Sequence, residues 1–148
     1  MRTGVRIGLD LGSKRIGVAR SDRDGLLAVP VAVLDATADW EQQFAALLAE
    51  QPVLEVVIGM PITLRGTAEL AAEQMRARIH EIHARFPELQ LRIVDERLSS
   101  STANRQLRAA GHDTKSARTV VDAVAAAELL EYALEFERRT GQPAGELL

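Results

Sequence analysis

The segment Ile7–Ala19 constrains the fold most, because it places one acidic side chain inside a strand-like run beside a glycine turn. Alternation along a strand puts Leu9 on one side and Gly8, Asp10 and Gly12 on the other. Asp10 thus projects over a surface that the two glycines leave free of side-chain bulk. The turn at Gly12 and the apolar run after it predict a β-hairpin with Lys14 and Arg15 at its tip. We expect a polar or charged ligand to approach Asp10.

Length and composition limit the classes of protein to which this hairpin can belong. A chain of 148 residues is most simply one domain, and a domain of that size buries roughly 68–70% of its unfolded surface. The absence of cysteine excludes thiol nucleophiles, zinc–thiolate sites and disulfides. A strand pattern begins directly after residues 1–4, without an apolar signal segment or a stretch long enough to span a bilayer. We therefore expect a cytoplasmic protein.

The net charge of −3 is unevenly distributed along the chain. Residues 1–20 carry five basic groups against one acidic group, and residues 92–118 carry six against three. The remaining segments hold the compensating negative charge. The two basic stretches could meet as one patch for phosphate, whereas the plainer interpretation is solvated surface charge.

Hydrophobic patterning predicts an α/β fold. After the hairpin we expect a strand over Ala28–Leu34, an edge strand because of Pro30, a helix over about 39–50, and strands over Leu54–Gly59 and Leu91–Asp95. A long helix precedes Pro87, another follows Ser99, and the last runs from Ser116 to about Arg139. This order favours a mixed five-stranded sheet, with an antiparallel hairpin first and parallel strands after it, covered by helices on both faces. We expect one domain over residues 1–139 and a flexible tail over 140–148.

Three acidic positions beyond ordinary surface charge stand out. Asp10 is the first, Asp95 and Glu96 end a strand, and Asp122 lies in line with the apolar stripe of the last helix. Singly, each has a structural explanation: Asp10 could bind turn amides, Glu96 could pair with Arg97, and Asp122 could meet the helix dipole. Three converging carboxylates would repel one another unless a cation neutralised them. An oxygen-only ligand set selects Mg²⁺ or Mn²⁺.

Four motifs resemble those of the YqgF family, also called RuvX, in the same order. They are Gly8–Ala19 with Ser21-Asp22, Val57–Pro61, Asp95–Ser99, and Val121-Asp122 with Ala125-Ala126. The resemblance implies an RNase H-like fold related to the RuvC-type Holliday junction resolvases. It also implies a nuclease that trims the 5′ end of precursor 16S ribosomal RNA.

The resemblance makes Asp10, Glu96 and Asp122 the catalytic, metal-binding acids. Asp95 and Glu96 point to opposite faces of a strand, so only one enters the site, and we expect Glu96 to do so. Where the family often has Met-Asp-Gly after its Gly-Xaa-Pro motif, this chain has Leu64-Arg65-Gly66 and lacks the loop acid. The implied chemistry is metal-assisted hydrolysis, in which one ion activates water, a second stabilises the departing oxygen, and Asp10 bridges both.

Basic residues near these motifs are candidates for phosphate contacts. They are Lys14, Arg15, Arg65, Arg97, Arg105, Lys115 and Arg118. Aromatic residues make up only 3% of the chain, which favours recognition of backbone and shape over base reading.

Three other functions compete with an RNA nuclease. The segment Asp10–Ser13 also resembles the phosphate loop of actin-like ATPases and sugar kinases, but those proteins close two domains on a nucleotide and this length supplies one. Resolution of branched DNA stays open and would require a symmetric dimer. A non-catalytic nucleic-acid or ribosome-binding module would gain nothing from a repulsive acidic cluster. We therefore expect a metal-dependent nuclease acting on RNA, with precursor ribosomal RNA as its substrate.

Overall fold

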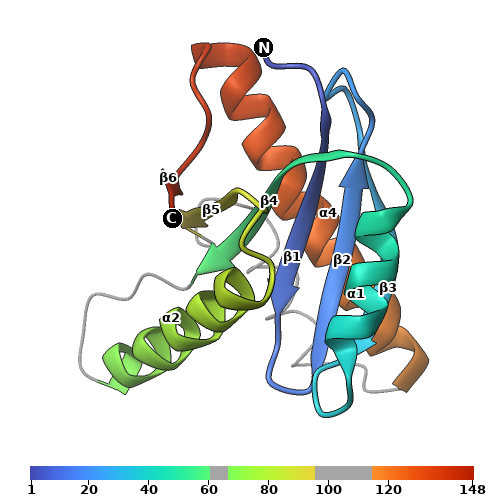
Figure 1. The fold of residues 1–148 in the computed structure, drawn as a ribbon, viewed down its shortest axis with the longest axis vertical. Helices are drawn as coiled ribbons and strands as arrows, with labels where there is room; N and C mark the ends of the chain where they lie inside the picture. Colours follow the sequence, from blue (N-terminus) through green and yellow to red (C-terminus); the bar gives the residue numbers. More distant parts are fainter. Residues whose placement is uncertain (61–66, 96–114) are drawn as a thin grey trace.

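The computed structural model describes residues 1–60, 67–95 and 115–148, without the side chains of 67–71 and 115–120. A six-stranded sheet forms the middle layer. Helix α4 (Lys115–Thr140) covers one face, and helices α1 (Trp40–Ala49) and α2 (Thr67–Arg85) cover the other (Figure 1). The predicted fold class, with helices on both faces of a mixed sheet, is confirmed. The helix predicted after Ser99 lies outside the described residues.

The sheet follows the predicted order of antiparallel and parallel pairs. Strands β1 (Val5–Leu11) and β2 (Arg15–Ser21) form the hairpin, and β3 (Ala28–Asp35) pairs antiparallel with β2 at the sheet edge. Strands β4 (Val53–Met60) and β5 (Leu91–Asp95) then add parallel to β1. The carboxyl ends of β1, β4 and β5 therefore lie at one edge of the sheet, together with the hairpin tip.

The sixth strand, β6 (Glu146–Leu147), corrects the expected strand count of five. It lies within residues 140–148, where we expected a flexible tail, and pairs antiparallel with β5. Gly141 and Gly145, with φ of 74° and 69°, turn the chain back, and Ala144 between them is buried. A side chain at Gly145 would collide with the Ile93 carbonyl oxygen. A two-residue strand is too short to show alternation, so the sequence pattern missed it.

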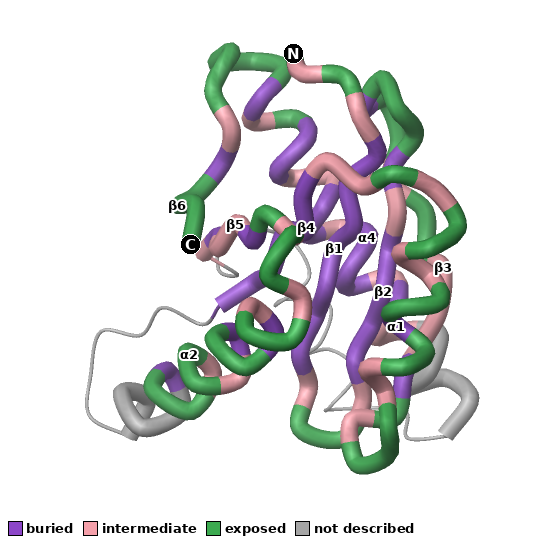
Figure 2. Tube along the Cα trace, viewed as in Figure 1, coloured by how far each residue is buried: buried purple, intermediate pink, exposed green. Residues whose placement is uncertain are grey.

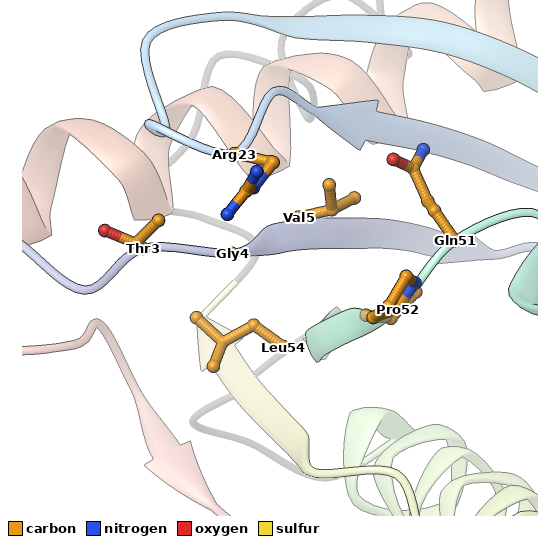
Figure 3. A pocket seen from close by; sticks show the side chains of 8 residues that line it. Thr3, Gly4, Val5, Arg23, Gln51, Pro52 and Leu54 are labelled. Atoms are coloured by element: carbon orange, nitrogen blue, oxygen red, sulfur yellow. The ribbon is translucent and has the colours of Figure 1, made fainter.

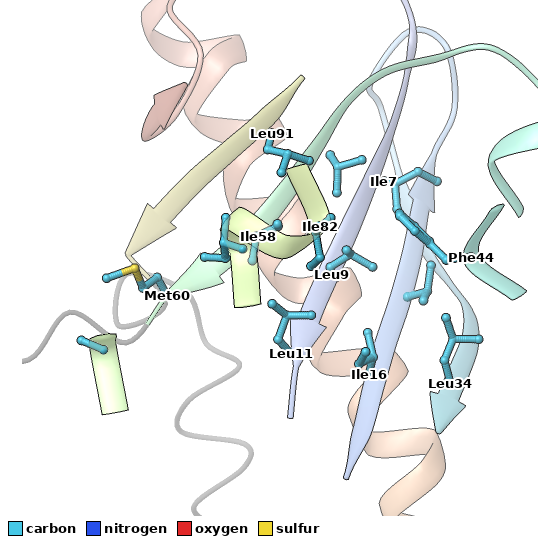
Figure 4. Packing of buried hydrophobic residues seen from close by; sticks show 14 residues of the cluster. Ile7, Leu9, Leu11, Ile16, Leu34, Phe44, Ile58, Met60, Ile82 and Leu91 are labelled. Atoms are coloured by element: carbon cyan, nitrogen blue, oxygen red, sulfur yellow. The ribbon is translucent and has the colours of Figure 1, made fainter. Parts of the chain in front are cut away.

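Each face of the sheet has its own apolar cluster. On the α1/α2 face, Leu9 and Ile58 of the sheet pack with Phe44 of α1 and Ile82 of α2 (Figure 4). The α4 face has a second cluster that includes Ala19, Val57, Val94, Ala126, Leu129 and Leu130. Figure 2 shows the central strands buried and the outer turns exposed. Side chains on β1, β4 and β5 can therefore be assigned to a face by the cluster that their neighbours join.

A charged cluster is buried at the end of the α4 face far from the hairpin tip. Its members are Arg2, Arg6, Glu55, Arg92 and Glu137. The Arg2 guanidinium bonds Glu55 at 2.8 Å and Glu137 at 2.6 Å, and Arg6, only 1% exposed, bonds Glu137 at 3.1 Å. Burial tends to raise the pKa of Glu137, but hydrogen bonds from Arg2 outweigh it and hold that pKa below its usual value. This cluster ties the N-terminal segment to α4 and β4.

No helix in the described ranges combines the length and the apolar character needed to cross a membrane.

Candidate active site

Asp10 lies near the carboxyl end of β1 and is 5% exposed. Its neighbours Leu9 and Leu11 join the α1/α2 cluster, so Asp10 lies on the opposite face of the strand, which α4 covers. Gly17 on β2 is its direct partner. On the other side, Leu9 pairs with Ile58, so Gly59 lies level with Asp10 on β4. The carboxylate thus stands between two glycines on neighbouring strands.

Asp122 reaches this place because α4 packs backbone to backbone on the hairpin. A side chain at Gly17 would overlap the carbonyl oxygen of Asp122, and one at Gly8 would lie 2.9 Å from that of Ala126. The helix therefore crosses directly over the strand partner of Asp10 (Figure 1). Gly17 permits this close approach, and the sequence analysis did not single it out. Its signal is its position among the apolar residues of β2, where a β-branched residue would favour the strand more.

Substitution of Gly17 by Ala should displace Asp122. The new methyl group would overlap the Asp122 carbonyl, which we expect to cost about 1–3 kcal/mol of folding stability, and to weaken Mn²⁺ binding measured by calorimetry. Gly141→Ala is the control, because that position has no atom within 4 Å of an added Cβ. It should lose some stability through its φ of 74° but keep Mn²⁺ affinity. Unchanged Mn²⁺ affinity in Gly17→Ala would contradict this placement.

Arg15 forms an ion pair with Asp122. Its Nε donates to Asp122 Oδ2 at 2.7 Å, with the two side chains 30% and 19% exposed. The guanidinium thus supplies positive charge next to Asp122, two residues along β2 from Gly17, the strand partner of Asp10. Lys14, the other predicted phosphate contact at the hairpin tip, is exposed. Its carbonyl oxygen accepts a 2.9 Å hydrogen bond from the Ala36 N–H, which anchors the tip to the segment after β3.

The other predicted site residues are only partly described. Glu96, Arg65, Arg97 and Arg105 lie outside the described residues. Lys115 and Arg118 lie in the first turns of α4, and their side chains are outside the description. Asp95 is described: it pairs with Met60, which packs in the α1/α2 cluster, so Asp95 faces away from Asp10.

The described residues supply two oxygen donors for a metal, Asp10 and Asp122. They come from different elements, α4 bringing Asp122 over Gly17, the strand partner of Asp10, and they offer the hard ligands that Mg²⁺ and Mn²⁺ prefer. Within the described ranges, no group of three or more His, Cys, Asp or Glu residues could hold a metal ion. A complete site therefore needs a donor from elsewhere in the chain, and Glu96 is the predicted one.

Comparison with known proteins supports the family resemblance that the four sequence motifs indicate. A family model, RuvX, described as Holliday junction resolvase, matches residues 4–136. A protein of Thermobifida fusca is 42% identical over 155 residues, covering 100% of this chain and 98% of that protein. One of Streptomyces coelicolor is 41% identical over 99% of this chain and 89% of its own length. Both carry the name "Putative pre-16S rRNA nuclease".

A solved structure supports the fold. The structure of Thermus thermophilus RuvC in complex with a Holliday junction substrate superposes with a TM-score of 0.52 over 98% of this chain and 99% of that one, at 14% identity. The RuvC-type, RNase H-like fold that the motifs implied is thereby confirmed.

Proposed function

The chain belongs to the RuvX family, and on that basis we propose that it is a divalent-metal-dependent nuclease that matures the 5′ end of precursor 16S ribosomal RNA. The observation that carries the chemistry is the approach of Asp122 to the strand partner of Asp10 across Gly17. The names of the full-length relatives support the RNA substrate. The absence of a membrane-crossing helix from the described residues fits the cytoplasm, where we place this reaction.

Asp10, Glu96 and Asp122 would hold Mg²⁺ or Mn²⁺. Val94 packs in the α4 cluster and Asp95 faces the opposite side. If the strand direction continues for one residue, alternation turns Glu96 to the α4 face, where Asp10 lies. Since Asp95 faces the α1/α2 side, Glu96 is favoured over Asp95 as the third acid.

Bound divalent ions would supply a hydroxide nucleophile at neutral pH and would stabilise the departing oxygen. The chain's own residues position the reactants. Asp10, fixed in the sheet between glycines, holds its carboxylate in one place, and α4 holds that of Asp122. Arg15 neutralises Asp122 in the structure and would turn to a substrate phosphate, which its planar guanidinium fits, when another cation takes that carboxylate.

Glu96→Gln and Asp95→Asn form a matched pair of neighbouring substitutions. We expect Glu96→Gln to lower the cleavage rate by about 10²–10⁴-fold, because a lost metal ligand removes several kcal/mol of transition-state stabilisation. Asp95→Asn should keep a rate close to that of the unmodified protein, because Asp95 faces the α1/α2 side. Cleavage rates under single-turnover conditions provide the measurement. The reverse pattern would make Asp95 the metal ligand.

The substrate is tested by comparing precursor 16S ribosomal RNA with four-way DNA, each with Mg²⁺, Mn²⁺ or chelator. We expect cleavage of the RNA near its 5′ end with either metal and none with chelator. Cleavage of the junction with the RNA left intact would favour the second candidate, a resolvase, which the description of the family model supports. Cleavage of neither would favour a nucleic-acid or ribosome-binding module.

A further inference from the structure

A groove of about 620 Å³ lies between α1 and α2, on the face of the sheet opposite α4. It is lined by Ala36 and Ala38 after β3, by Trp40 and Glu41 of α1, and by Arg78, Glu81, Ile82, Ala84 and Arg85 of α2. Figure 1 shows the two helices over this face, with α1 beginning at the edge that carries the hairpin tip. The groove is separate from the acidic site but opens at the same edge of the molecule.

Backbone contacts link the groove to the hairpin tip. Ala36, in its wall, donates its N–H to the Lys14 carbonyl oxygen at 2.9 Å. The preceding residue, Asp35, lies opposite Arg15 in the β2–β3 strand register. The Arg15 side chain in turn forms the ion pair with Asp122. A strand leaving the acidic site over the tip would pass Arg15 and Lys14 and arrive at the groove.

Arg78 brings a positive charge into the groove, and Glu81, three residues along α2, offsets part of it. The Arg78 side chain is half-buried, and burial lowers the pKa of its guanidinium although the charge of Glu81 opposes this. None of the described side chains forms an ion pair with Arg78. The neighbouring Arg85 is different, because Glu41 lies 3.8 Å from it across the groove. A partly buried guanidinium that forms no direct ion pair with a described residue can still donate hydrogen bonds to an anionic ligand.

Trp40 adds an aromatic surface beside this charge. It is the only tryptophan in the chain and is half-buried, with its ring 6.0 Å from that of Phe44 and inclined at 43°. Phe44 is completely buried, so the indole is held by the core on one side and lines the groove on another. An aromatic ring and an arginine together are the means by which proteins bind single-stranded nucleic acid.

We propose that this groove binds single-stranded RNA adjoining the cleavage site, with a base stacked on Trp40 and a phosphate held by Arg78. The inference rests on the proposed nuclease function, because it takes the substrate strand to be RNA. It adds a binding site on the face away from the catalytic acids, and it gives the sole tryptophan a contact with substrate.

Intrinsic fluorescence of the full chain provides the test. We would titrate it with single-stranded oligouridylate of about 12 nucleotides, within the range that such grooves bind, in chelator and at several salt concentrations. The oligonucleotide should quench Trp40. Arg78→Ala should weaken binding about 5- to 10-fold and reduce the slope of log affinity against log salt by about 0.7, the value for one phosphate contact on a single strand. Arg78→Lys should restore part of the affinity and the slope.

Arg23→Ala is the matched control. Like Arg78, Arg23 forms no ion pair among the described residues, but it is exposed and lines a different pocket, of about 420 Å³, with Thr3, Gly4 and Leu54 (Figure 3). That pocket lies at the far end of β1 from Asp10. Arg23→Ala should bind RNA as the unmodified protein does.

Two results would contradict RNA binding in the groove. One is that the oligonucleotide does not quench Trp40, and the other is that Arg78→Ala and Arg23→Ala lose affinity equally. Thermal melting checks that each variant is folded. If Arg78→Ala does not fold, the affinity and salt slope of Arg78→Lys test the role of Arg78 instead. Because binding is measured in chelator, the oligonucleotide should quench the Trp40 fluorescence of Asp10→Asn as it does that of the unmodified protein. If the protein cuts RNA and Arg78→Ala leaves the oligonucleotide affinity unchanged, only RNA binding in the groove is contradicted. If the protein does not cut RNA but its oligonucleotide affinity depends on Arg78, only the proposed nuclease function is contradicted.

Discussion

Asp10→Asn is expected to lower RNA cleavage by about 10³-fold. The carboxylate is 5% exposed and lies between Gly17 and Gly59, so the amide would occupy the same space with one charge fewer. A bridging metal ligand is worth several kcal/mol in the transition state, and each 1.36 kcal/mol changes the rate tenfold. Single-turnover cleavage of precursor RNA measures the loss, and calorimetry with Mn²⁺ should show weaker binding.

Asp24→Asn is the control for Asp10→Asn. Asp24 is an exposed acid in the turn between β2 and β3, at the opposite end of the sheet from Asp10. The same chemical change there should leave cleavage and Mn²⁺ affinity unaltered. Full activity of Asp10→Asn, with circular dichroism and melting like those of the unmodified protein, would exclude Asp10 as a metal ligand and the proposed mechanism with it.

Long periodic elements explain why much of the site was predictable. Along β1, Ile7, Leu9 and Leu11 join the α1/α2 cluster, whereas Gly8 lies against Ala126 of α4, so a period of two in the sequence separates Asp10 from the apolar face. The stripe Ala126, Leu129 and Ala133 is buried against the sheet as expected, and a period of 3.6 placed Asp122 in line with it. An acid on an otherwise apolar face is visible without any knowledge of tertiary structure.

Contacts between distant residues were not predictable in the same way. The Arg15–Asp122 pair joins residues separated by 107 positions, and the sequence indicated only a phosphate contact for Arg15. The close approach of α4 to Gly17 depends on how the helix crosses the sheet, which no local pattern encodes. Similarly, no local pattern distinguishes Glu55 and Glu137 from surface charges, although both are buried. The partner of a charged side chain decides its role, and single-sequence patterns do not reveal partners.

Glu137→Gln should destabilise the fold by about 3–5 kcal/mol, the cost of breaking a buried ion pair by removing one partner. Glu137 accepts hydrogen bonds from the Arg2 backbone, the Arg2 side chain and Arg6. Without its charge, the cluster would hold three arginines and one glutamate, Glu55, with Arg6 only 1% exposed. Urea denaturation measures the change in the free energy of unfolding.

Glu135→Gln, two residues away on α4, separates burial from loss of charge. Glu135 also pairs with an arginine, Arg138, at 2.7 Å, but its side chain is 51% exposed, so stability should hardly change. The two variants should also differ in acid. Because the pKa of Glu137 is held below its usual 4.5 in the folded state, its contribution is complete above that pH and is lost as pH falls through the lower folded value. Glu137→Gln should therefore lose less stability in acid than the unmodified protein. Parallel plots of the free energy of unfolding against pH for the two proteins would show that the contacts of Arg2 and Arg6 do not depend on this charge.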